Sequence, residues 1–294
     1  MLSILIPTYD YTCYKLVFDL HKQAEALSIP YEIIVAEDGS RSQVCIIANH
    51  KICELPNCRH IIRKENVGRA AIRNFLITEA KGDVLLFMDA DGKVVRNDFI
   101  ARYWEAGKTH DVVCGGIKTP DVWRDPTRML RWKYEKAYEQ RHGYISTQFR
   151  SFCFLISRRV SENVKFDERY QEYGYEDVQY GKDLAAAGFN VFAIDNPLEN
   201  TDIETNKVFL KKTEAALRTA SKFQEDIGDL VVVTATYQKY KIFGWAMRIF
   251  FSLFRNSMQR NLFSANPSLM VFRLYKLCYF SYLQKWANSP SHLS

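Results

Sequence analysis

The sequence lacks the roughly 20 uninterrupted apolar residues that a membrane-spanning helix needs. It contains no Cys-x-x-Cys pair, and its seven cysteines are scattered and odd in number, which argues against a disulfide framework. Two histidines lie among the cysteines between positions 45 and 60, but their spacing matches no zinc knuckle. No secretory signal peptide begins the chain, because Met1 leads directly into a short apolar segment before Pro7. These absences predict a cytoplasmic protein with reduced thiols.

Acidic residues are missing from the last 65 positions, because Asp229 is the final carboxylate of the chain. This tail, residues 230–294, contains eight lysines and arginines, so its charge of +8 leaves −2 on the preceding 229 residues of a chain with net charge +6. The body is therefore nearly neutral and the tail basic. We do not expect a nucleic-acid partner, because the body is slightly acidic and the tail is too apolar on one face.

The tail contains a basic amphipathic segment. Lys241, Arg248 and Arg255 are spaced seven apart and share one helical face with Ser252 and Gln259. Apolar residues occupy the opposite face: Phe243, Ala246, Met247, Phe250, Leu253 and Phe254. Such a helix can lie on the surface of an anionic membrane, which would make the protein peripheral on the cytoplasmic face. Alternatively, its apolar face packs on the rest of the chain or on a second subunit.

The first half of the chain alternates between short apolar runs and segments with helical spacing. We expect strands over 2–6, 32–36, 60–63, 84–88 and 111–114, with helices over 14–27, 44–52 and 69–80. The pattern loosens afterwards, into helices over 126–140, 178–187 and 207–223 and strands over 152–156 and 190–194. Alternation of this kind predicts an α/β fold, with a Rossmann-like, mostly parallel sheet flanked by helices. The only break in composition falls near Asp229.

Two carboxylates follow the most apolar of the expected strands. Residues 84–88 run directly into Asp89 and Asp91, which flank Ala90. In open α/β sheets, ligands bind outside the carboxyl ends of the strands. Two hard oxygen ligands at that edge can hold Mg²⁺ or Mn²⁺, and the ion can bridge a diphosphate. Asp-x-Asp alone is a weak motif, because a strand-ending turn with Gly92 explains it equally well.

The other expected strands also end in polar clusters, at Thr8, at Glu37-Asp38 and before Arg69. Because parallel strands point the same way, these clusters meet at one rim and form a pocket. Asp38 can accept a hydrogen bond from a base N–H, and Arg69 at a helix start can meet a diphosphate. The alternative is structural, with a capped turn at Asp38 and a solvated charge at Arg69.

A second acidic pair, Glu176 and Asp177, stands where a helix is expected to begin. The helix dipole keeps a carboxylate ionised there, and an ionised carboxylate that faces an acceptor can take a proton from its hydroxyl. The neighbouring glycines and tyrosines permit close approach and sugar stacking. The alternative interpretation is structural: the two carboxylates only complement the charge of the helix dipole.

Taken together, these segments resemble the family 2 glycosyltransferases, which have the GT-A fold. Five segments carry the resemblance, and they occur in the family's order within residues 1–225: Ser3-Ile4-Leu5-Ile6-Pro7-Thr8-Tyr9, Glu37-Asp38-Gly39-Ser40, Asn66-Val67-Gly68 with Arg73-Asn74, Asp89-Ala90-Asp91 and Gly174-Tyr175-Glu176-Asp177. The set is specific, although each segment alone is not.

The resemblance implies an inverting, metal-assisted transfer from a nucleoside-diphosphate sugar, with a UDP-sugar favoured. The acceptor would be a hydroxyl of a glycan or of a lipid-linked glycan. Mn²⁺ or Mg²⁺ would be bound by Asp91, with Asp89. Asp177 would be the general base and Glu176 would bind the acceptor. The remaining positions would hold the donor: Pro7, Thr8, Tyr9, Glu37, Asp38, Arg69, Asp89 and Ala90.

The resemblance also divides the chain into a nucleotide-sugar-binding half over 1–110, an acceptor-binding and catalytic half over 111–229, and the helical basic and aromatic tail over 230–294. One departure concerns the metal. Many relatives carry a histidine after the short strand beyond the base, and here Asn200 takes that place, with Asp202 or water as the substitute ligand. Two alternatives remain: a nucleotide-sugar binder without catalysis, and a haloacid-dehalogenase-like phosphatase that uses Asp89 and Asp91.

Overall fold

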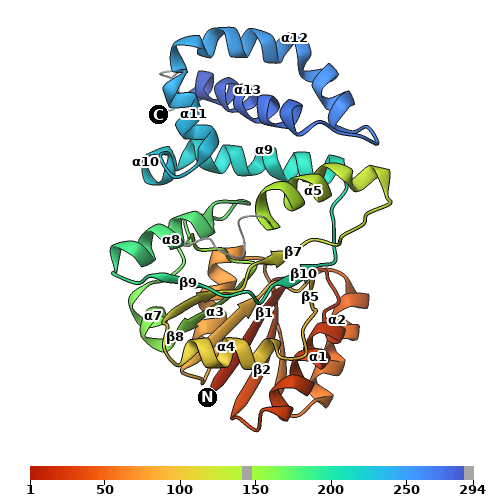
Figure 1. Ribbon diagram of the computed structural model, residues 1–294, viewed down its shortest axis with the longest axis vertical. Coiled ribbons are helices and arrows are strands. Elements are labelled where there is room, and N and C mark those ends of the chain that lie inside the picture. The colour runs from red at the N-terminus through yellow and green to blue at the C-terminus, as the bar shows by residue number, and fades with distance from the viewer. Residues whose placement is uncertain (141–147, 288–294) are drawn as a thin grey trace. The chain divides into compact units, whose positions relative to one another are not determined.

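The computed structural model describes residues 1–140 and 148–287, and the chain divides into two compact units (Figure 1). The sheet unit comprises Met1–Pro120, Lys136–Gln171 and Glu176–Asp202. The helical unit comprises Asp121–Glu135, Glu172–Tyr175 and Ile203–Ser294. Residues 288–294 of the predicted tail lie outside the described residues.

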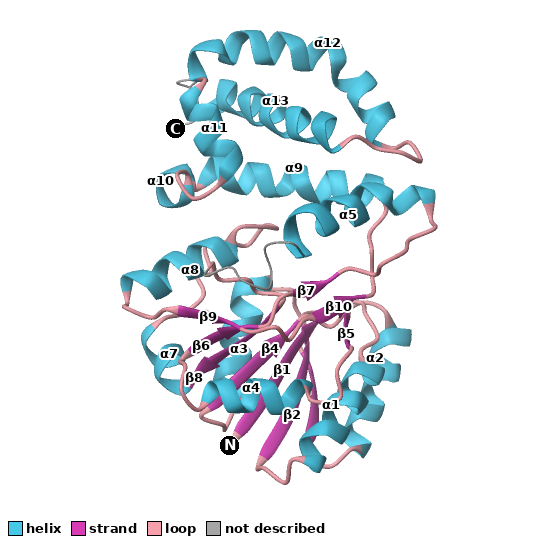
Figure 2. Ribbon diagram, in the orientation of Figure 1, coloured by secondary structure: helices cyan, strands magenta, loops and turns pink. Residues whose placement is uncertain are grey.

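The sheet unit is built on a seven-stranded sheet with the order β3-β2-β1-β4-β8-β6-β9 (Figure 2). Pairing is parallel between β3, β2, β1 and β4, and again between β6 and β9. Only β8 runs antiparallel to both of its neighbours in this sheet. The strands are β1 Leu2–Thr8, β2 Tyr31–Glu37, β3 Cys58–Ile62, β4 Val84–Met88, β6 Val112–Cys114, β8 Cys153–Ser157 and β9 Val191–Ala193.

Helices cover both faces of this sheet because its central strands are apolar on both sides. Leu5 of β1 packs into a core with α3 and α8, whereas its neighbours Ile4 and Ile6 pack into a core with α1 and α4. Such near-continuous apolar strands are typical of parallel sheets buried on both faces. The helices of this unit are α1 Tyr14–Ala26, α2 Gln43–His50, η1 Lys51–Glu54, α3 Arg69–Glu79, α4 Phe99–Gly107, α7 Arg158–Asn163 and α8 Glu176–Ala186.

A small second sheet follows the end of β4. It consists of β5 (Gly92–Val94), β10 (Leu198–Asn200) and β7 (Ile117–Lys118), with β10 in the middle. β10 pairs antiparallel with β5, and Asn200 lies opposite Gly92. This pairing brings the residues after β10 beside the Asp-x-Asp segment that precedes β5.

The helical unit has its own apolar core. Phe251 of α12, Phe272 and Phe280 of α13, and Leu217 of α9 are each at most 2% exposed and belong to one cluster. Its elements are η2 Pro126–Arg128, α5 Met129–Tyr134, α9 Asn206–Lys222, α10 Gln224–Ile227, α11 Val232–Lys239, η4 Lys241–Phe243, α12 Gly244–Leu262 and α13 Leu269–Ala287. A π-helical turn, η3 Glu135–Glu139, follows α5.

The predicted fold class is confirmed: a mostly parallel sheet with helices on both faces. The expected strand over 84–88 has the predicted bounds, and the expected helices over 14–27 and 69–80 end one residue early. The sequence interpretation omitted α4, α7 and the three short strands of the second sheet. The division into halves at residue 110 and a tail from 230 stays a prediction, although α9 before Asp229 shares its core with α12 and α13 beyond it.

Among residues 1–140 and 148–287, no helix combines the length and the apolar character that crossing a membrane would require.

Candidate active site

The polar clusters predicted from the sequence lie at one edge of the seven-stranded sheet. β1 pairs in parallel with β2 on one side and with β4 on the other, so the carboxyl ends of all three strands point the same way. Thr8 lies opposite Glu37 in this register. The helix that follows β3 begins at Arg69, after Gly68 with φ +89°. A Cβ at Gly68 would lie 3.2 Å from the Gln171 carbonyl oxygen, which explains why glycine is needed at this turn.

Arginine side chains from α3 connect two of the predicted clusters. Arg69 donates to Asp89 Oδ2 over 2.7 Å and, through Nε, to Glu176 Oε1 over 2.9 Å. Arg73 donates to Asp89 Oδ1 over 3.1 Å and to Glu176 Oε1 over 3.3 Å. The carboxylate after β4 and the carboxylate at the start of α8 are therefore joined by the same two guanidinium groups. This network brings the Asp-x-Asp segment and the predicted base into one site within the sheet unit.

Arg73 is the residue of this network that the sequence interpretation left without a role. Its side chain is 1% exposed and lies 5.5 Å from the Phe166 ring. A signal was present, because Arg73 falls on the same helical stripe as the buried Leu76, Ile77 and Ala70. Since an arginine on a buried stripe needs an anionic partner, the sequence could have predicted a buried ion pair here.

Asp91 lies in a strongly negative environment. Burial, and then the charge of Asp89, raise its pKa from 3.8 to about 7, while Arg69 opposes the shift and Asp202 adds to it. Thr201 donates to the Asp91 backbone carbonyl through its N–H, over 3.0 Å, and through its hydroxyl, over 2.8 Å. These contacts keep Asp202 close to Asp91. A divalent cation bound between the two carboxylates would neutralise part of this charge.

The side chains around Asp91 can be compared with the ligands that a metal ion requires. No cluster of three or more His, Cys, Asp or Glu side chains suited to a metal occurs among the described residues. Asp91 and Asp202 nevertheless provide hard carboxylate oxygens, the ligands that Mg²⁺ and Mn²⁺ prefer, and such ions usually keep ligands from water and substrate phosphate. Asn200 is 3% exposed and its side-chain oxygen accepts from the Asp202 N–H over 3.1 Å. The chemistry of the two carboxylates suits such a cation, and Asn200 fixes the backbone of Asp202.

Asp177 is the second residue of α8, and burial raises its pKa from 3.8 to about 6, helped by the charge of Glu176. Arg150, Arg69 and Arg73 partly offset that rise. The Asp177 Oδ1 atom accepts the Val178 N–H over 2.9 Å, which fixes the carboxylate at the helix start. A carboxylate with a pKa near 6 is ionised at neutral pH and is a stronger proton acceptor than an ordinary aspartate.

Glu176 and Arg150 complete the surroundings of Asp177. Glu176 is 5% exposed, and its Oε1 atom accepts hydrogen bonds from both arginines of α3. Its carboxylate is therefore held by the arginine network. Arg150 has a buried Nε atom without a hydrogen-bond partner, and its charge lowers the pKa of Asp177. No sequence pattern marked Arg150, because it stands outside any recognisable motif.

The predicted nucleotide-binding residues form the other side of the rim. Tyr9 is 45% exposed and Pro7 is half-buried, whereas Thr8 is buried and donates from its hydroxyl to the Tyr11 carbonyl over 3.1 Å. Asp38 is buried, and its two oxygens accept the N–H groups of Val67 and Gly68 over 3.0 and 3.1 Å. Burial raises the pKa of Asp38, and these two hydrogen bonds oppose the rise.

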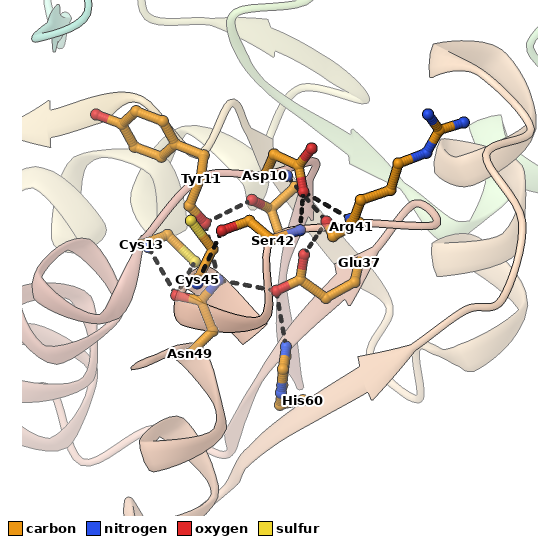
Figure 3. Close-up of polar contacts among 11 residues, drawn as sticks. Asp10, Tyr11, Cys13, Glu37, Arg41, Ser42, Cys45, Asn49 and His60 are labelled. Carbon is orange, nitrogen blue, oxygen red and sulfur yellow. Dashed lines mark hydrogen bonds and ion pairs between the residues drawn. The ribbon is translucent and has the colours of Figure 1, made fainter. Parts of the chain in front are cut away.

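Glu37 is 0% exposed and so lies inside the protein rather than on the rim, and Figure 3 shows its carboxylate beside Asn49 and His60. Its Oε1 atom binds His60 Nε2 over 3.0 Å and the Asn49 amide over 2.8 Å, and Ser40 donates to its other oxygen. Asn49 in turn accepts the Cys13 N–H over 2.8 Å. Burial raises the pKa of Glu37, but these hydrogen bonds outweigh burial and leave the pKa below its usual value. Glu37 thus secures the loop after β1.

Asp10 secures the same loop from the outside. Its Oδ1 atom accepts the N–H groups of Arg41 and Ser42, both over 2.7 Å, and its own N–H donates to Ser40 (Figure 3). Asp10 has φ +49°, a left-handed conformation that this ring of hydrogen bonds holds in place. The loops after β1 and β2 are therefore connected to each other before any ligand binds.

The chain belongs to glycosyl transferase family 2, whose family model matches residues 3–164. This match confirms the family and the enzyme class, a glycosyltransferase, that the sequence predicted. The alternative of a haloacid-dehalogenase-like phosphatase is set aside by the same match. The matched segment includes the whole rim except Glu176, Asp177 and the residues after β10.

Comparisons with known proteins agree with this assignment. An uncharacterized glycosyltransferase YfnE of Bacillus subtilis is 29% identical over 144 residues, which span 48% of this chain and 33% of that protein. The matched segment therefore spans about a third of the length of this relative.

Two solved structures share the fold. The mannosyltransferase PcManGT of Pyrobaculum calidifontis, in complex with GDP-Man and Mn²⁺, has a TM-score of 0.55 at 13% identity and covers 98% of this chain and 86% of its own. Residues 1–349 of S. aureus TarS, in complex with UDP, have a TM-score of 0.51 at 15% identity. The match covers 97% of this chain and 91% of that structure. At these identities the likeness establishes the GT-A fold.

Proposed function

We propose that this protein transfers a sugar, with inversion, from a nucleoside-diphosphate sugar to a hydroxyl group of a glycan or lipid-linked glycan. The observation that carries the proposal is the ionic network of Arg69, Arg73, Asp89 and Glu176. It joins Asp89 after β4, two residues before Asp91, to Glu176 at the start of α8, next to Asp177. A cation-binding carboxylate and a proton-accepting carboxylate then share one site, which the transfer requires.

The donor would be held at the rim of the sheet. Tyr9 is exposed enough to stack on a base, beside Pro7 and Thr8. Asp38 can accept a base N–H with the lone pairs that its two backbone partners leave free. Arg69 is 41% exposed, so its guanidinium can reach a diphosphate while it also binds Asp89. Asp89 and its neighbour Ala90 would then lie near the ribose or the donor sugar. A UDP-sugar remains the favoured donor. The bound UDP and GDP-Man of the two solved structures support a nucleotide-sugar donor in general.

The chemistry would be a single displacement at the anomeric carbon. Asp177 takes the proton of the acceptor hydroxyl as its oxygen forms a bond to that carbon. The bond from the anomeric carbon to the diphosphate oxygen breaks, and its electron pair leaves with the nucleoside diphosphate. Because attack comes from the face opposite the leaving group, the anomeric configuration inverts. A Mn²⁺ or Mg²⁺ ion held by Asp91 and Asp202, with Asp89 nearby, would stabilise the negative charge of the departing diphosphate.

Glu176 was expected to bind the acceptor. Since its Oε1 atom is shared by Arg69 and Arg73, we propose that Glu176 acts chiefly by holding the two arginines. Glu37 likewise supports the nucleotide-binding loop from beneath rather than contacting the donor.

A thermal-shift screen of the full chain tests the donor and metal parts of the proposal. UDP, GDP and their sugar derivatives are each added with and without Mn²⁺, because a ligand that binds only the native state raises stability by about 2.7 kcal/mol at 100 times its Kd. We expect at least one nucleotide to raise Tm by a few degrees, and only when Mn²⁺ is present.

The matched variants are Asp91→Asn and Asp229→Asn, since Asp229 is exposed and lies outside the site. The first should lose the Mn²⁺-dependent part of the shift and the second should keep it. An unchanged metal response in Asp91→Asn would refute the metal site. Donor binding without hydrolysis or transfer would favour the binder without catalysis, the alternative that Asn200 suggested.

A further inference from the structure

Helix α12 has two apolar faces, and the described residues of the chain cover one of them. Its inner face carries Phe251, Met258 and Leu262, which are buried in the core of the helical unit. Its outer face carries Trp245, Ile249 and Leu253, which are 62%, 52% and 72% exposed. We call these three, with their neighbours on the same side, the outer face of α12. The neighbours that are also exposed are Ile242, Phe243, Phe250 and Phe254.

The seven side chains form a continuous stripe along the helix. Residues 242, 245, 249 and 253 follow one another at helical spacing, and 243, 250 and 254 lie alongside them. A stripe of large apolar side chains of this extent on the surface of a folded unit marks an interaction site rather than the ordinary scatter of exposed apolar residues.

The charges around this stripe have one sign. Lys241 and Arg260 are exposed near the two ends of α12, and Arg248 and Arg255 lie along one flank. No acidic residue occurs after Asp229. The carboxylate of Glu214 on α9, a neighbour of this flank, is bound by Tyr275 over 2.5 Å and by Arg255 over 3.5 Å. The surroundings of the stripe are therefore basic, and the carboxylate of Glu214 is already paired.

We propose that the outer face of α12 inserts into the headgroup region of an anionic membrane, with the helix parallel to the surface. An apolar stripe with basic residues at its flank and ends matches the boundary between lipid headgroups and acyl chains, where lysines and arginines meet anionic phosphates. The 19-residue helix is about 28 Å long, and the stripe occupies its N-terminal half together with the short η4 before it. Trp245 and the phenylalanines supply the side chains that such interfaces prefer.

A second copy of this chain is a poorer occupant. A two-fold dimer through the outer face would bring the same patch of each subunit together, so the basic flank and ends of one helix would meet those of the other. An anionic surface instead pairs each of these charges with an opposite one. This proposal does not depend on the proposed function, because it concerns binding to lipid and not transfer.

Vesicle co-sedimentation of the full chain tests the proposal with two matched double variants. Ile249→Glu/Leu253→Glu places charge on the outer face, and Val44→Glu/Ile47→Glu places the same charge on α2, where both residues are exposed. The vesicles contain either phosphatidylcholine alone or phosphatidylcholine with phosphatidylglycerol. We expect the wild-type chain and the α2 variant to pellet with anionic vesicles, and the α12 variant to bind them roughly tenfold or more weakly.

A variant that leaves the apolar stripe intact tests the charge. Lys241→Gln/Arg260→Gln should lower partition into anionic vesicles by roughly fivefold per charge, the equivalent of about 1 kcal/mol each. Added salt should reduce the difference from wild type. On binding, Trp245 should give a blue shift of tryptophan fluorescence that Trp245→Phe lacks.

Three outcomes would overturn the proposal. One is equal pelleting of the wild-type chain and the α12 variant. Another is equal binding of the wild-type chain to neutral and anionic vesicles. The third is a dimer in solution that the α12 variant dissociates, without vesicle binding by the wild-type chain. Because the Lys241→Gln/Arg260→Gln variant changes exposed side chains only, it keeps the test decisive if the glutamate variant fails to fold.

Discussion

Arg73 is the side chain whose charge is most completely enclosed in the site. Its guanidinium satisfies Asp89 and Glu176 at once, so neither carboxylate is left as an uncompensated charge. A buried ion pair of this kind adds little to the free energy of unfolding when compared with apolar side chains in place of all its members. Removing one partner alone lowers the free energy of unfolding strongly, because the other charge stays buried. The role we assign to Arg73 is positioning, because it acts through Asp89 and Glu176 rather than on the substrate.

Replacing Arg73 with methionine should therefore be strongly destabilising. We expect Arg73→Met to lower the free energy of unfolding by about 3–5 kcal/mol, because Asp89 and Glu176 would lose the buried one of their two guanidinium partners and keep only the partly exposed Arg69. The matched control is Arg102→Met, which removes an exposed surface ion pair with Asp98 and should cost less than about 1 kcal/mol. Urea unfolding of the three proteins measures the difference. Similar losses for both variants would show that the network is not a buried one.

At the scale of elements, the loops after β1 and β2 are joined through α2 and β3. Glu37 at the end of β2, Asn49 of α2 and His60 of β3 form a buried chain of hydrogen bonds that reaches the Cys13 N–H. The loop predicted to hold the nucleoside is thus supported by three elements. Such support from beneath gives a binding loop its fixed geometry.

The pH dependence of stability should reveal this role of Glu37. Its pKa in the folded protein lies below the ordinary value of 4.5, so the ionised form stabilises the fold above that pH, and this contribution is lost as pH falls through the folded pKa. We expect Glu37→Gln to be less stable than wild type at pH 7 and the gap to narrow below about pH 4.5. Chemical unfolding at several pH values measures the gap, with the exposed Glu162→Gln as control. A gap that does not change with pH would contradict the assignment.

The sequence predicted much of the sheet because its strands are apolar on both faces and its helices have clear periodicity. Val84–Met88 and the two carboxylates after it are the best example. The three-residue strands β5 and β10 were missed, since so short a segment shows no alternation of its own and is fixed only by pairing with a distant partner. For the same reason, the sequence could suggest Asp202 as a partner of Asp91 but could not place the two side by side.

The burial of each side chain was harder to predict than the location of the polar clusters at the strand ends. Glu37 and Asp38 are adjacent in sequence, yet the carboxylate of Glu37 faces His60 and Asn49, while that of Asp38 faces the turn before α3. A strand places successive side chains on opposite faces, but the partners on each face come from other elements. The sequence therefore located the rim where we propose that the nucleotide binds, without separating residues that line it from residues that support it.

At the scale of the whole molecule, α12 and α13 belong to the core of the helical unit. Phe272 of α13 is 1% exposed and packs with Phe209 of α9, whereas Leu274 on the same helix is 41% exposed. The tail is thus held by its inner faces, and the outer face of α12 is left exposed by the described residues. Removing residues 240–294 would expose the apolar side of α9.

This arrangement predicts different costs for two substitutions on one helix. Phe272→Ala should lower the free energy of unfolding by about 3–5 kcal/mol, because it opens a cavity in the core. Leu274→Ala should cost less than about 1 kcal/mol, since its side chain is partly in solvent. Thermal unfolding followed by circular dichroism compares the two. If both are nearly neutral, the tail is not part of a packed core.

The central claim is that donor binding and proton removal are carried out by different residues of one site. Asp177→Asn keeps the size of the side chain and its place at the start of α8 but cannot accept the proton. It should bind a nucleotide sugar as tightly as wild type while transfer falls by roughly 10² to 10⁴. In the wild-type enzyme, kcat/KM should fall tenfold per pH unit below about 6, where Asp177 becomes protonated, and level off above it.

The most direct test is therefore to measure donor affinity by calorimetry and transfer rate with the same preparation of Asp177→Asn, in the presence of Mn²⁺ and beside wild type. The account predicts unchanged affinity together with a transfer rate below about 1% of wild type. Loss of affinity as large as the loss of transfer, or transfer that persists in the variant, would contradict it.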